Sequence, residues 1–523
     1  MNKTSTWQRR NRVAWDYAAA EIALLAGKQP QVAGTAVQAV RGWLAALGPV
    51  PPPKARVLIT ALRNSTWMEW AVYCACVIRR LGYESTLLVD REDIGRHYSS
   101  ESRDHGFWQQ AKRVPGLVLH DLSAGDLADE EDDWIKKRAI EWAPVAVAYD
   151  EHLEEHDVRT NPERFSGRID MSARRAEALG RGLHRLLSCG ARFDRAFCYS
   201  GLIGESRVLL DVFRYHDVST VCLEGWAWRP GHMIYNLNEP ALEYNVRGWL
   251  HSLGEWDGAK ERVVDEYLNF LNGRGRDAGW LENFYRIQRD VISATLAPML
   301  EQFVTGPEPI FLLAPNVIGD SSTLRRETIF PSMQEWIREV IQWFRARPHL
   351  KLVVRAHPAE QWIGSKCVVF IAEVAAAASS GAPNIYVLPS SDPTNTFSLV
   401  PYLRAGLIWL SSAGVDLVVR GVPACVAASP KYRDLGITEE PTSREDYFRL
   451  LENWGRTAVR PTASQISAGR SYLHLVFKGF SFEASSRNYR ATGLRLGAMP
   501  DQAEHDHFYR IILGEEPMPD RAL

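Results

Sequence analysis

The chain has 523 residues, 46% of them hydrophobic and 24% charged, with a formal net charge of −2 at pH 7. This length is too great for one hydrophobic core and predicts two domains with extensions, and the near-neutral balance gives no reason to expect nucleic acid as a partner. The sequence has no apolar run of about 18 residues, and its amino terminus lacks the apolar centre of a signal peptide. The seven cysteines are scattered without zinc-site spacing, so we expect reduced thiols in a cytoplasmic protein.

The first half begins with the elements of a doubly wound α/β fold. Residues 1–53 predict an Ala-rich helical extension that ends in three prolines, a stiff linker. An amphipathic helix over residues 68–81 closes at Gly82, and a charged stretch over residues 120–190 is mostly helical. Strands are predicted at residues 56–60, 85–90, 195–199 and 219–223. We therefore assign residues 54–300 to a first Rossmann-like domain.

The second half repeats this scheme. Strands are predicted at residues 308–315, 351–355, 384–388 and 405–410. The helix over residues 332–345 carries Trp336 and Trp343 on its apolar face. We assign residues 301–462 to a second Rossmann-like domain and residues 463–523 to a helix and tail that cross back to the first. The fold class is thus α/β, with two consecutive doubly wound domains.

A strand of the second half ends in polar groups that suit a phosphate. Residues 352–360 read Leu-Val-Val-Arg-Ala-His-Pro-Ala-Glu, and Pro358 stops the strand. Arg355 and His357 alternate with Ala356, which allows both side chains to point to one side. Ligands bind at the carboxyl ends of strands in open α/β sheets, so both residues are candidate phosphate ligands. A surface Arg beside a structural His is an equally good interpretation of this segment alone.

A strand, turn and helix follow at residues 405–420. Ser411 and Ser412 stand in the turn, where they can cap the helix and offer hydroxyls to a ligand. Asp416 lies in the first helical turn and is a candidate partner for ribose hydroxyls. An ordinary βαβ unit with an ordinary cap explains the same residues.

The second half resembles the capsule polysaccharide biosynthesis proteins, which are glycosyltransferases of the two-Rossmann GT-B type and include bacterial β-Kdo transferases. Short motifs in order carry this resemblance over residues 305–480, and the first half matches in outline. They are Asn316-Val317-Ile318-Gly319-Asp320-Ser321, Glu335-Trp336, Val354-Arg355-Ala356-His357-Pro358-Ala359-Glu360, Thr394-Asn395-Thr396, Ser411-Ser412-Ala413-Gly414-Val415-Asp416, Arg420-Gly421-Val422-Pro423 and Lys431-Tyr432-Arg433-Asp434-Leu435-Gly436.

Two departures leave the identity of the donor open. The family usually has Glu where this chain has Asp416, which has a shorter reach towards ribose. The family also has a Gly-Lys-Gly-Phe-like run where this chain has residues 433–437.

A looser likeness favours a CMP-activated donor. Bacterial sialyltransferases of the same architecture carry an acidic-Gly, a His-Pro and a Ser-Ser motif. This chain has Glu224-Gly225, His357-Pro358 and Ser411-Ser412 in that order.

Glycosyl transfer needs a stabilised leaving phosphate. Side chains and a helix amino terminus can supply this without metal, and no acidic pair follows a strand in a suitable context. We therefore expect no cofactor and no metal. The expected donor-binding residues are Asn316, Arg355, His357, Ser411, Ser412, Asp416 and Lys431.

Transfer also needs an activated acceptor hydroxyl. Glu224 follows a strand of the first half and is the candidate general base of an inverting reaction or nucleophile of a retaining one. Asp320 competes with it, although we place its loop facing the donor, and capping or salt bridging explains either carboxylate as well. Arg63, Asn64 and Trp67 follow the first strand and are candidates for acceptor binding, with surface and core roles as the alternative.

We therefore expect a cytoplasmic glycosyltransferase, at most peripheral at the inner membrane. It would transfer a nucleotide-activated sugar, such as CMP-Kdo or a related acidic sugar, to a surface polysaccharide, glycan or glycolipid acceptor. Two alternatives stay open: a CDP-alcohol phosphotransferase of the teichoic-acid type, and a non-catalytic nucleotide-sugar-binding or assembly protein.

Overall fold

The computed structural model describes most of the chain between residues 41 and 516. The described residues are 41–61 without 43, 46 and 48, then 65–90, 111–122, 133–225, 232–244, 246–251, 253–271, 296–360, 368–479, 481–483, 489–490, 493–494 and 502–516.

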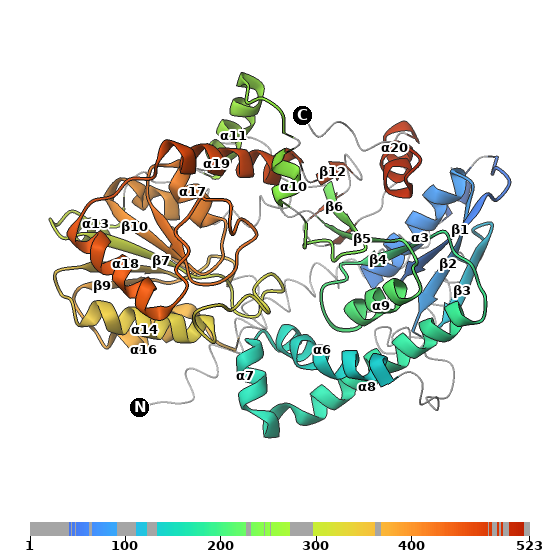
Figure 1. Ribbon diagram of the computed structural model, residues 1–523, viewed down its shortest axis with the longest axis horizontal. Coiled ribbons are helices and arrows are strands. Elements are labelled where there is room, and N and C mark those ends of the chain that lie inside the picture. The colour runs from blue at the N-terminus through green and yellow to red at the C-terminus, as the bar shows by residue number, and fades with distance from the viewer. Residues whose placement is uncertain are drawn as a thin grey trace. The chain divides into compact units, whose positions relative to one another are not determined.

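Contacts within the chain define two compact units. The first comprises Met1–Ala146, Gly167–Tyr244 and Ser481–Pro519, and the second comprises Val147–Ser166, Asn245–Phe480 and Asp520–Leu523. Each is built on a mainly parallel sheet, which confirms the predicted pair of Rossmann-like α/β halves (Figure 1). The predicted boundaries at residues 300 and 462 differ from this division, because residues 147–166, 245–300 and 463–480 belong with the second unit.

The first unit has a seven-stranded sheet in the order β12-β6-β5-β4-β1-β2-β3. Its strands are β1 (Ala55–Thr60), β2 (Tyr83–Val89), β3 (Leu117–Asp121), β4 (Arg195–Tyr199), β5 (Thr220–Gly225), β6 (His232–Leu237) and β12 (Ser481–Glu483). The strands from β3 to β5 run parallel, whereas β6 and β12 are antiparallel to their neighbours. Sequence patterns predicted four of these strands and missed β3, β6 and β12.

Helices cover both faces of this sheet. They are α3 (Ser65–Arg80), α6 (Asp133–Glu151), α8 (Pro162–Ser188), α9 (Gly204–Tyr215) and α20 (Gln502–Leu513). Successive side chains of a strand point to opposite faces. On β4, Phe197 packs towards Tyr509 of α20, with ring centroids 6.5 Å apart, while the Cys198 thiol donates to the Ser206 carbonyl of α9 at 3.7 Å.

The carboxyl-terminal helix α20 completes the core of the first unit. Tyr509 and Ile512 are each 1% exposed. Beyond the helix, Glu515 forms an ion pair with Lys54 and accepts a hydrogen bond from the Tyr83 hydroxyl at 2.9 Å. The return to the first half is therefore made by α20, whereas the helix predicted to cross back, α19 (Ala463–His474), packs in the second unit.

The second unit has a five-stranded, fully parallel sheet in the order β11-β10-β7-β8-β9. Its strands are β7 (Ile310–Ala314), β8 (Lys351–Arg355), β9 (Ile385–Leu388), β10 (Leu403–Ile408) and β11 (Ala424–Val426). The chain moves outward from β7 through β8 to β9, then returns to β10 on the other side of β7. The topological switch point, where α/β sheets bind ligands, therefore lies between β7 and β10.

The helices of the second unit lie on both faces of its sheet. They are α7 (Glu155–Thr160), α10 (Val246–His251), α11 (Gly258–Leu271), α13 (Pro298–Val304), α14 (Met333–Arg345), α16 (Ile371–Ser379), α17 (Ala413–Val419), α18 (Arg444–Arg456) and α19, with a 3₁₀ turn at Thr396–Tyr402 and a π-helical turn at Leu475–Gly479. Figure 1 shows α14 and α16 on one face and α17 and α19 on the other.

Both predicted tryptophans of the second unit belong to its core, Trp336 at the centre and Trp343 at the margin. Trp336 is fully buried, its ring lies 5.5 Å from that of Trp409, and its indole N–H donates to the Tyr447 hydroxyl at 3.0 Å. Trp343 is half-buried and stacks with the Arg347 guanidinium at 4.0 Å.

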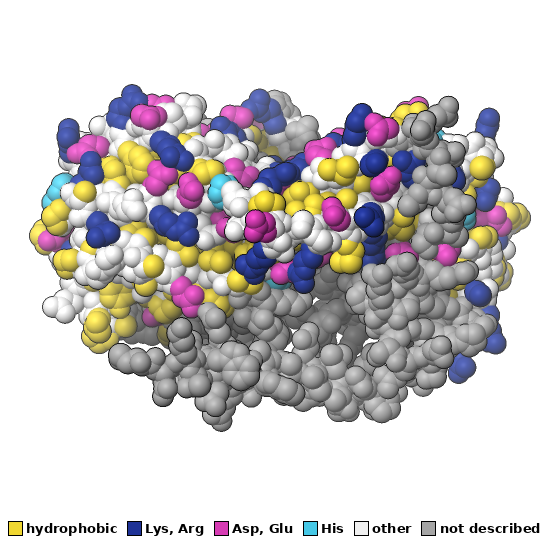
Figure 2. Space-filling model, turned by 90° about the horizontal axis from the view of Figure 1, so that it is seen from below, with side chains coloured by type: hydrophobic (Ala, Val, Ile, Leu, Met, Phe, Trp, Pro, Cys, Tyr) yellow, Lys and Arg dark blue, Asp and Glu magenta, His cyan; other side chains and the backbone are white. Residues whose placement is uncertain are grey.

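The surface mixes charges of both signs. Figure 2 shows Lys and Arg side chains interspersed with Asp and Glu side chains on the face it presents, rather than a continuous patch of one sign. Across the part of the chain that the structure describes, no helix has the length and apolar character needed to cross a membrane.

The loop after β7 depends on a glycine that packs against a distant backbone. Gly319 has φ +74°, and a Cβ added there would lie 2.5 Å from the carbonyl carbon of His152 and 2.7 Å from the nitrogen of Leu153. Residues 152 and 153 form the corner between α6 and α7, in the segment that joins the second unit. This close approach fixes the loop that carries Asn316 and Asp320.

We expect Gly319→Ala to lower the melting temperature of the second unit by roughly 5–10 °C, because the methyl group overlaps backbone that cannot rotate away. Gly381→Ala is the matched control, since Gly381 has φ +73° and nothing within 4 Å of the added Cβ. In Gly381→Ala the free energy of unfolding should fall only by the cost of the left-handed backbone conformation, about 1–2 kcal/mol. Equal losses in the two variants, measured by calorimetry, would show that the contact with residues 152 and 153 contributes nothing.

Candidate functional site

Polar groups meet at the switch point of the second sheet. The ends of β7 and β10 are direct neighbours, with Ala314 paired to Ile408. Beyond these strands, the Asn316 side-chain oxygen accepts a hydrogen bond from the backbone N–H of Leu410 at 3.3 Å. Asn316 is half-buried and therefore ties the two strand ends together at the place where a ligand is expected.

Asp320 lies in the loop after β7 and organises it. Its carboxylate accepts from the N–H of Ser322 at 2.8 Å, and its carbonyl accepts from the N–H of Thr323 at 2.9 Å. The side chain is half-buried, and its charge acts on His357 at the end of the neighbouring strand β8. The structure thus brings Asp320 and His357 into one electrostatic environment.

His357 is held in a defined tautomer. Its Nδ1 accepts a hydrogen bond from the N–H of Ala359 at 3.2 Å, which places the proton of the neutral ring on Nε2. Burial lowers the pKa of His357 to about 4; Asp320 opposes this shift and Arg355 adds to it. At neutral pH His357 is therefore an uncharged ring with an N–H donor, so that it can serve a phosphate as a hydrogen-bond donor and not as a cation.

Arg355 is placed differently from the prediction of a direct phosphate ligand. It is 2% exposed, and its two terminal nitrogens donate to the carbonyls of Pro389 at 2.7 Å and Asp392 at 3.0 Å. Burial lowers the pKa of Arg355 to about 10, with Asp392 and Glu360 opposing. The guanidinium remains a cation that anchors the loop after β9, and its charge reaches the site through space.

The Ser411-Ser412 turn is held by a hydrogen bond within the turn and by a hydrogen bond from Tyr432. The Ser411 hydroxyl accepts from the N–H of Ala413 at 3.2 Å, while the Ser411 carbonyl accepts from the hydroxyl of buried Tyr432 at 2.7 Å. A Cβ on Gly414 would lie 2.6 Å from that hydroxyl, so glycine is needed for this packing. Ser412 is the residue before α17, and its side chain makes no hydrogen bond that caps this helix. The helix-capping role considered for the Ser412 hydroxyl is therefore not observed.

Asp416 and Lys431 differ in their accessibility. Asp416 is 2% exposed and pairs with Arg420 one helical turn later, at 3.4 Å. Burial raises the pKa of Asp416 to about 6, against the opposing effect of Arg420. This placement does not fit the predicted contact with ribose hydroxyls. Lys431 is half-buried in the loop after β11, next to Tyr432.

Two residues from the matched motifs cap a helix of the same unit. Arg420 donates to the Leu268 carbonyl at 3.5 Å and lies 4.2 Å from the centre of the Phe397 ring. Asn395 donates to the Leu271 carbonyl at 3.0 Å. Both carbonyls belong to the last turn of α11, whose orphan groups these side chains satisfy.

Sequence patterns missed two buried carboxyl groups near the site. Glu360 follows the His-Pro segment, is 1% exposed and accepts the N–H of Ile371 at the start of α16 at 3.1 Å. Burial raises the pKa of Glu360 to about 7.

Glu154 is the second such group. It is 5% exposed and accepts the N–H groups of Met333 at 2.6 Å and Gln334 at 3.1 Å, which are orphan donors of α14. Asp157 accepts from the Gln334 side chain at 2.8 Å. No local pattern reveals this role, because Glu154 and α14 are far apart in the sequence.

In the first unit, Glu224 lies at the carboxyl end of β5 as predicted. It is half-buried and pairs in register with Ile234 of β6. The Ser200 hydroxyl donates to a carboxylate oxygen of Glu224 at 2.9 Å. Arg63 and Asn64, predicted to bind the acceptor, lie outside the described residues, and of Trp67 only the backbone within α3 is described.

Among the residues that the structure describes, no three or more His, Cys, Asp or Glu side chains are arranged to hold a metal ion. The expectation of a metal-independent site stays a prediction.

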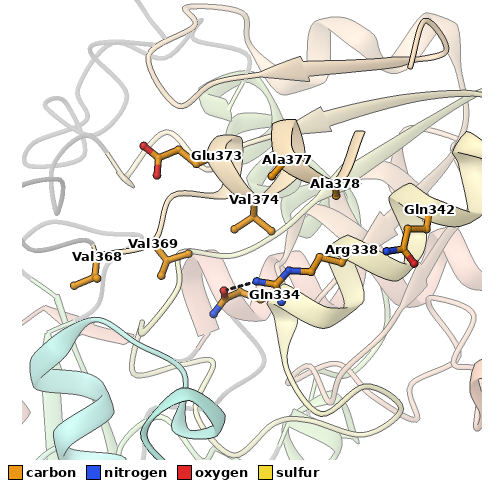
Figure 3. Close-up of a pocket in the computed structure, with 9 residues that line it drawn as sticks. All are labelled: Gln334, Arg338, Gln342, Val368, Val369, Glu373, Val374, Ala377 and Ala378. Carbon is orange, nitrogen blue, oxygen red and sulfur yellow. Dashed lines mark hydrogen bonds between the residues drawn. The ribbon is translucent and has the colours of Figure 1, made fainter. Parts of the chain in front are cut away.

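A groove lies elsewhere on the second unit. It encloses about 480 Å³ between α14 and α16, and Figure 3 shows Arg338 hydrogen-bonded to Gln334 along one wall, with Val374 and Ala378 opposite. None of the predicted site residues lines this groove. It belongs to the helical layer and not to the carboxyl ends of the strands, so we do not place the donor there.

Comparisons with known proteins were made at three levels. No protein-family model matches the chain, and no curated protein matches it. Among solved structures, the β-Kdo 2,7 transferase KpsC of Thermosulfurimonas dismutans is 12% identical with a TM-score of 0.34, covering 59% of this chain and 84% of that chain. The KpsC β-Kdo 2,4 transferase of the same organism is 15% identical with a TM-score of 0.32, covering 54% and 79%.

A putative UDP-N-acetylglucosamine 2-epimerase of Listeria monocytogenes is 12% identical with a TM-score of 0.28, covering 89% of this chain and 98% of that chain. Likenesses at these TM-scores carry no argument about activity. The function therefore has to be derived from the chain's own residues.

The cap formed by Glu154 predicts a pH dependence of stability. Burial raises the pKa of Glu154 to about 7, with its hydrogen bonds to α14 opposing and the charge of Asp157 adding to the shift. Between about pH 4.5 and 7 the folded protein thus holds a proton that the unfolded chain releases, so stability falls as pH rises through this window, by on the order of 2–3 kcal/mol. We expect Glu154→Gln to flatten this slope in the melting temperature of the second unit.

Glu335→Gln is the control for this prediction. Glu335 stands in the first turn of the same helix, and its side chain is 40% exposed. Its replacement should leave the slope unchanged. If Glu154→Gln keeps the wild-type slope as well, the carboxyl group of Glu154 is not the origin of the pH dependence.

Proposed function

We propose that the chain is a metal-independent glycosyltransferase of the GT-B type, which transfers a sugar from a nucleotide-activated donor to a glycan acceptor. The single observation that supports this most is that Asn316, Asp320, His357 and the Ser411-Ser412 turn follow the carboxyl ends of the adjacent strands β7, β8 and β10, next to the switch point of a fully parallel sheet. This is the place where open α/β sheets bind nucleotides.

His357 is the proposed donor of a hydrogen bond to the leaving phosphate. With Nδ1 accepting from Ala359, the Nε2–H group is the donor of the neutral ring. As the bond between the sugar and the phosphate breaks, negative charge grows on the phosphate oxygen, and a preorganised donor stabilises it. The Ser412 hydroxyl and the buried charge of Arg355 support the same oxygen atoms.

The charge balance at this site favours a donor with one phosphate. Arg355 is engaged with two carbonyls, and Asp416 is engaged with Arg420. A leaving monophosphate carries about −1.5 to −2 charges at pH 7, and a second phosphate adds further charge that needs cations or metal. We therefore favour CMP-linked sugars, with CMP-Kdo or a related acidic sugar as the first candidate, which agrees with the motif resemblance.

Glu224 is the proposed catalytic carboxylate. In an inverting reaction it takes the proton of the acceptor hydroxyl while that oxygen bonds to the anomeric carbon, and the nucleotide leaves with the electrons of the broken bond. In a retaining reaction Glu224 itself bonds to the anomeric carbon and is displaced in a second step. Asp320, which organises its own loop, is the second candidate.

A thermal-shift screen with CMP, CDP, UDP and GDP tests the proposal. Binding to the folded protein alone raises its stability by RT ln(1 + [L]/Kd), about 2.7 kcal/mol at a hundredfold excess over Kd. We expect CMP to give the largest shift, and the same shift in EDTA. A response to none of the four nucleotides, or one that vanishes in EDTA, contradicts the proposal.

We predict that His357→Ala weakens CMP binding by about 10- to 100-fold and leaves the fold intact, the effect of losing one hydrogen bond to a charged phosphate. Isothermal calorimetry measures the affinity, and His349→Ala is the control. His349 is exposed in the turn before β8, so its replacement should not change binding. Equal affinity of the two folded variants would remove His357 from the donor site.

We predict that Glu224→Gln keeps CMP affinity and lowers sugar transfer by about 10²-fold or more, because an amide neither accepts the proton nor attacks carbon. Mass spectrometry of the intact wild-type protein with donor tests the retaining alternative, in which a covalently attached sugar would appear. Turnover within a few-fold of wild type would make Glu224 structural and Asp320 the first candidate.

A further inference from the structure

Ser200 has an unusual backbone conformation at the carboxyl edge of the first sheet. It directly follows β4 and has φ +54°, in the left-handed region that favours glycine and asparagine. Gly201 follows it with φ +69°. A non-glycine residue held in this region signals that the surrounding structure has a use for its side chain.

The backbone of Ser200 is fixed on both sides. Its N–H donates to the Leu223 carbonyl at 2.8 Å, and its carbonyl accepts from the N–H of Ala241 at 2.8 Å. Tyr199 and Leu223 are paired in register on β4 and β5, so the residues that follow them, Ser200 and Glu224, are neighbours.

Close packing confines the turn further. A Cβ on Gly201 would lie 2.8 Å from the Cys222 sulfur, so the chain has no room to relax beside Ser200. The turn therefore presents the Ser200 hydroxyl in one orientation, and in that orientation it donates to the carboxylate of Glu224 at 2.9 Å.

We propose that Ser200 is a positioning residue for Glu224: its hydroxyl holds the carboxylate in the orientation that sugar transfer needs. This rests on the proposed function, in which Glu224 is the catalytic carboxylate. A hydrogen bond to the charged form of a carboxyl group favours that form. Glycine would adopt the backbone conformation of Ser200 at a lower cost in free energy. What serine adds over glycine at this position is its hydroxyl group.

Two substitutions separate the effect of the hydroxyl group from the effect of the backbone conformation. Ser200→Gly removes the hydroxyl and suits the left-handed conformation, whereas Ser200→Ala removes the hydroxyl and keeps the strain. Ser200→Asn suits the backbone and offers an amide N–H in place of the hydroxyl. Ser206→Ala is the matched control, because the Ser206 hydroxyl in the same segment donates to the Ile203 carbonyl and not to a carboxylate.

The first measurement does not depend on activity. Carbodiimide with glycinamide labels protonated carboxyl groups, and peptide mapping by mass spectrometry follows the label on Glu224 as pH is varied. We expect the pH midpoint of labelling to rise by about one unit in Ser200→Gly and Ser200→Ala, because Glu224 keeps its proton to higher pH without the donor. Ser200→Asn should restore most of the shift, and Ser206→Ala should show none.

The second measurement is turnover of CMP-Kdo at neutral pH. We expect Ser200→Gly and Ser200→Ala to lose about tenfold each, with CMP affinity unchanged, and Ser200→Asn to recover part of the loss. Normal turnover and labelling in Ser200→Gly beside a damaged Ser200→Ala would mean that only the backbone matters, which overturns the positioning role.

The turnover of Glu224→Gln distinguishes failure of the positioning role of Ser200 from failure of the catalytic role of Glu224. If Glu224→Gln loses turnover while Ser200→Gly matches wild type in both measurements, the positioning role fails and the catalytic assignment stands. If Glu224→Gln turns over normally, the catalytic assignment fails and the positioning role fails with it.

Discussion

The reversal of strand order between the parallel strands β7 and β10 is the constraint on which the candidate site depends. Parallel strands place their carboxyl ends at one edge, and the crossovers leaving β7 and β10 diverge to opposite sides of the sheet. The backbone groups at this point lack partners from a helix, so side chains supply them, as Asn316 does for the N–H of Leu410. The loops that carry Asp320, His357 and Ser412 are thereby brought to one place. In the first unit, the parallel pairing of the consecutive strands β4 and β5 puts Ser200 beside Glu224.

Many of the charged side chains around the candidate site of the second unit form hydrogen bonds that hold its loops in place. Arg355 donates to two carbonyls beyond β9, Glu360 receives the first N–H of α16, and Glu154 receives two N–H groups of α14. Burying such groups is costly unless each is hydrogen-bonded, and here each one closes a helix end or a turn. The charged groups are thus used to hold loops and helix ends, and the nearby His357 is neutral because its pKa is low. In the proposed function, the donor phosphate is therefore held by hydrogen bonds and not by accumulated positive charge.

The amino-acid pattern predicted the parts of the fold that local periodicity encodes. The strands at 195–199 and 351–355 and the helix ending before Gly82 agree closely with β4, β8 and α3, because burial on one or both faces sets their apolar spacing. The pattern could not predict β12, α20 or the position of residues 147–166, since these are defined by partners hundreds of residues away. Local sequence patterns were limited in the same way at the candidate site of the second unit. The motif containing Arg355 located a strand end correctly, but a motif does not reveal whether a guanidinium meets a ligand or a carbonyl.

These corrections change the chemistry that the site can perform. A pair of cations at the end of β8 would suit almost any phosphate, including a diphosphate. A neutral imidazole with its proton on Nε2, beside a buried guanidinium engaged with carbonyls, stabilises less charge and does so directionally. Such a site discriminates by geometry, since the phosphate oxygen must meet one N–H group along its axis. In the proposed function, a leaving group with a single phosphate carries the smaller charge that this N–H group has to stabilise. The engagement of Arg355 with two carbonyls is therefore the observation that most supports the proposed donor with a single phosphate.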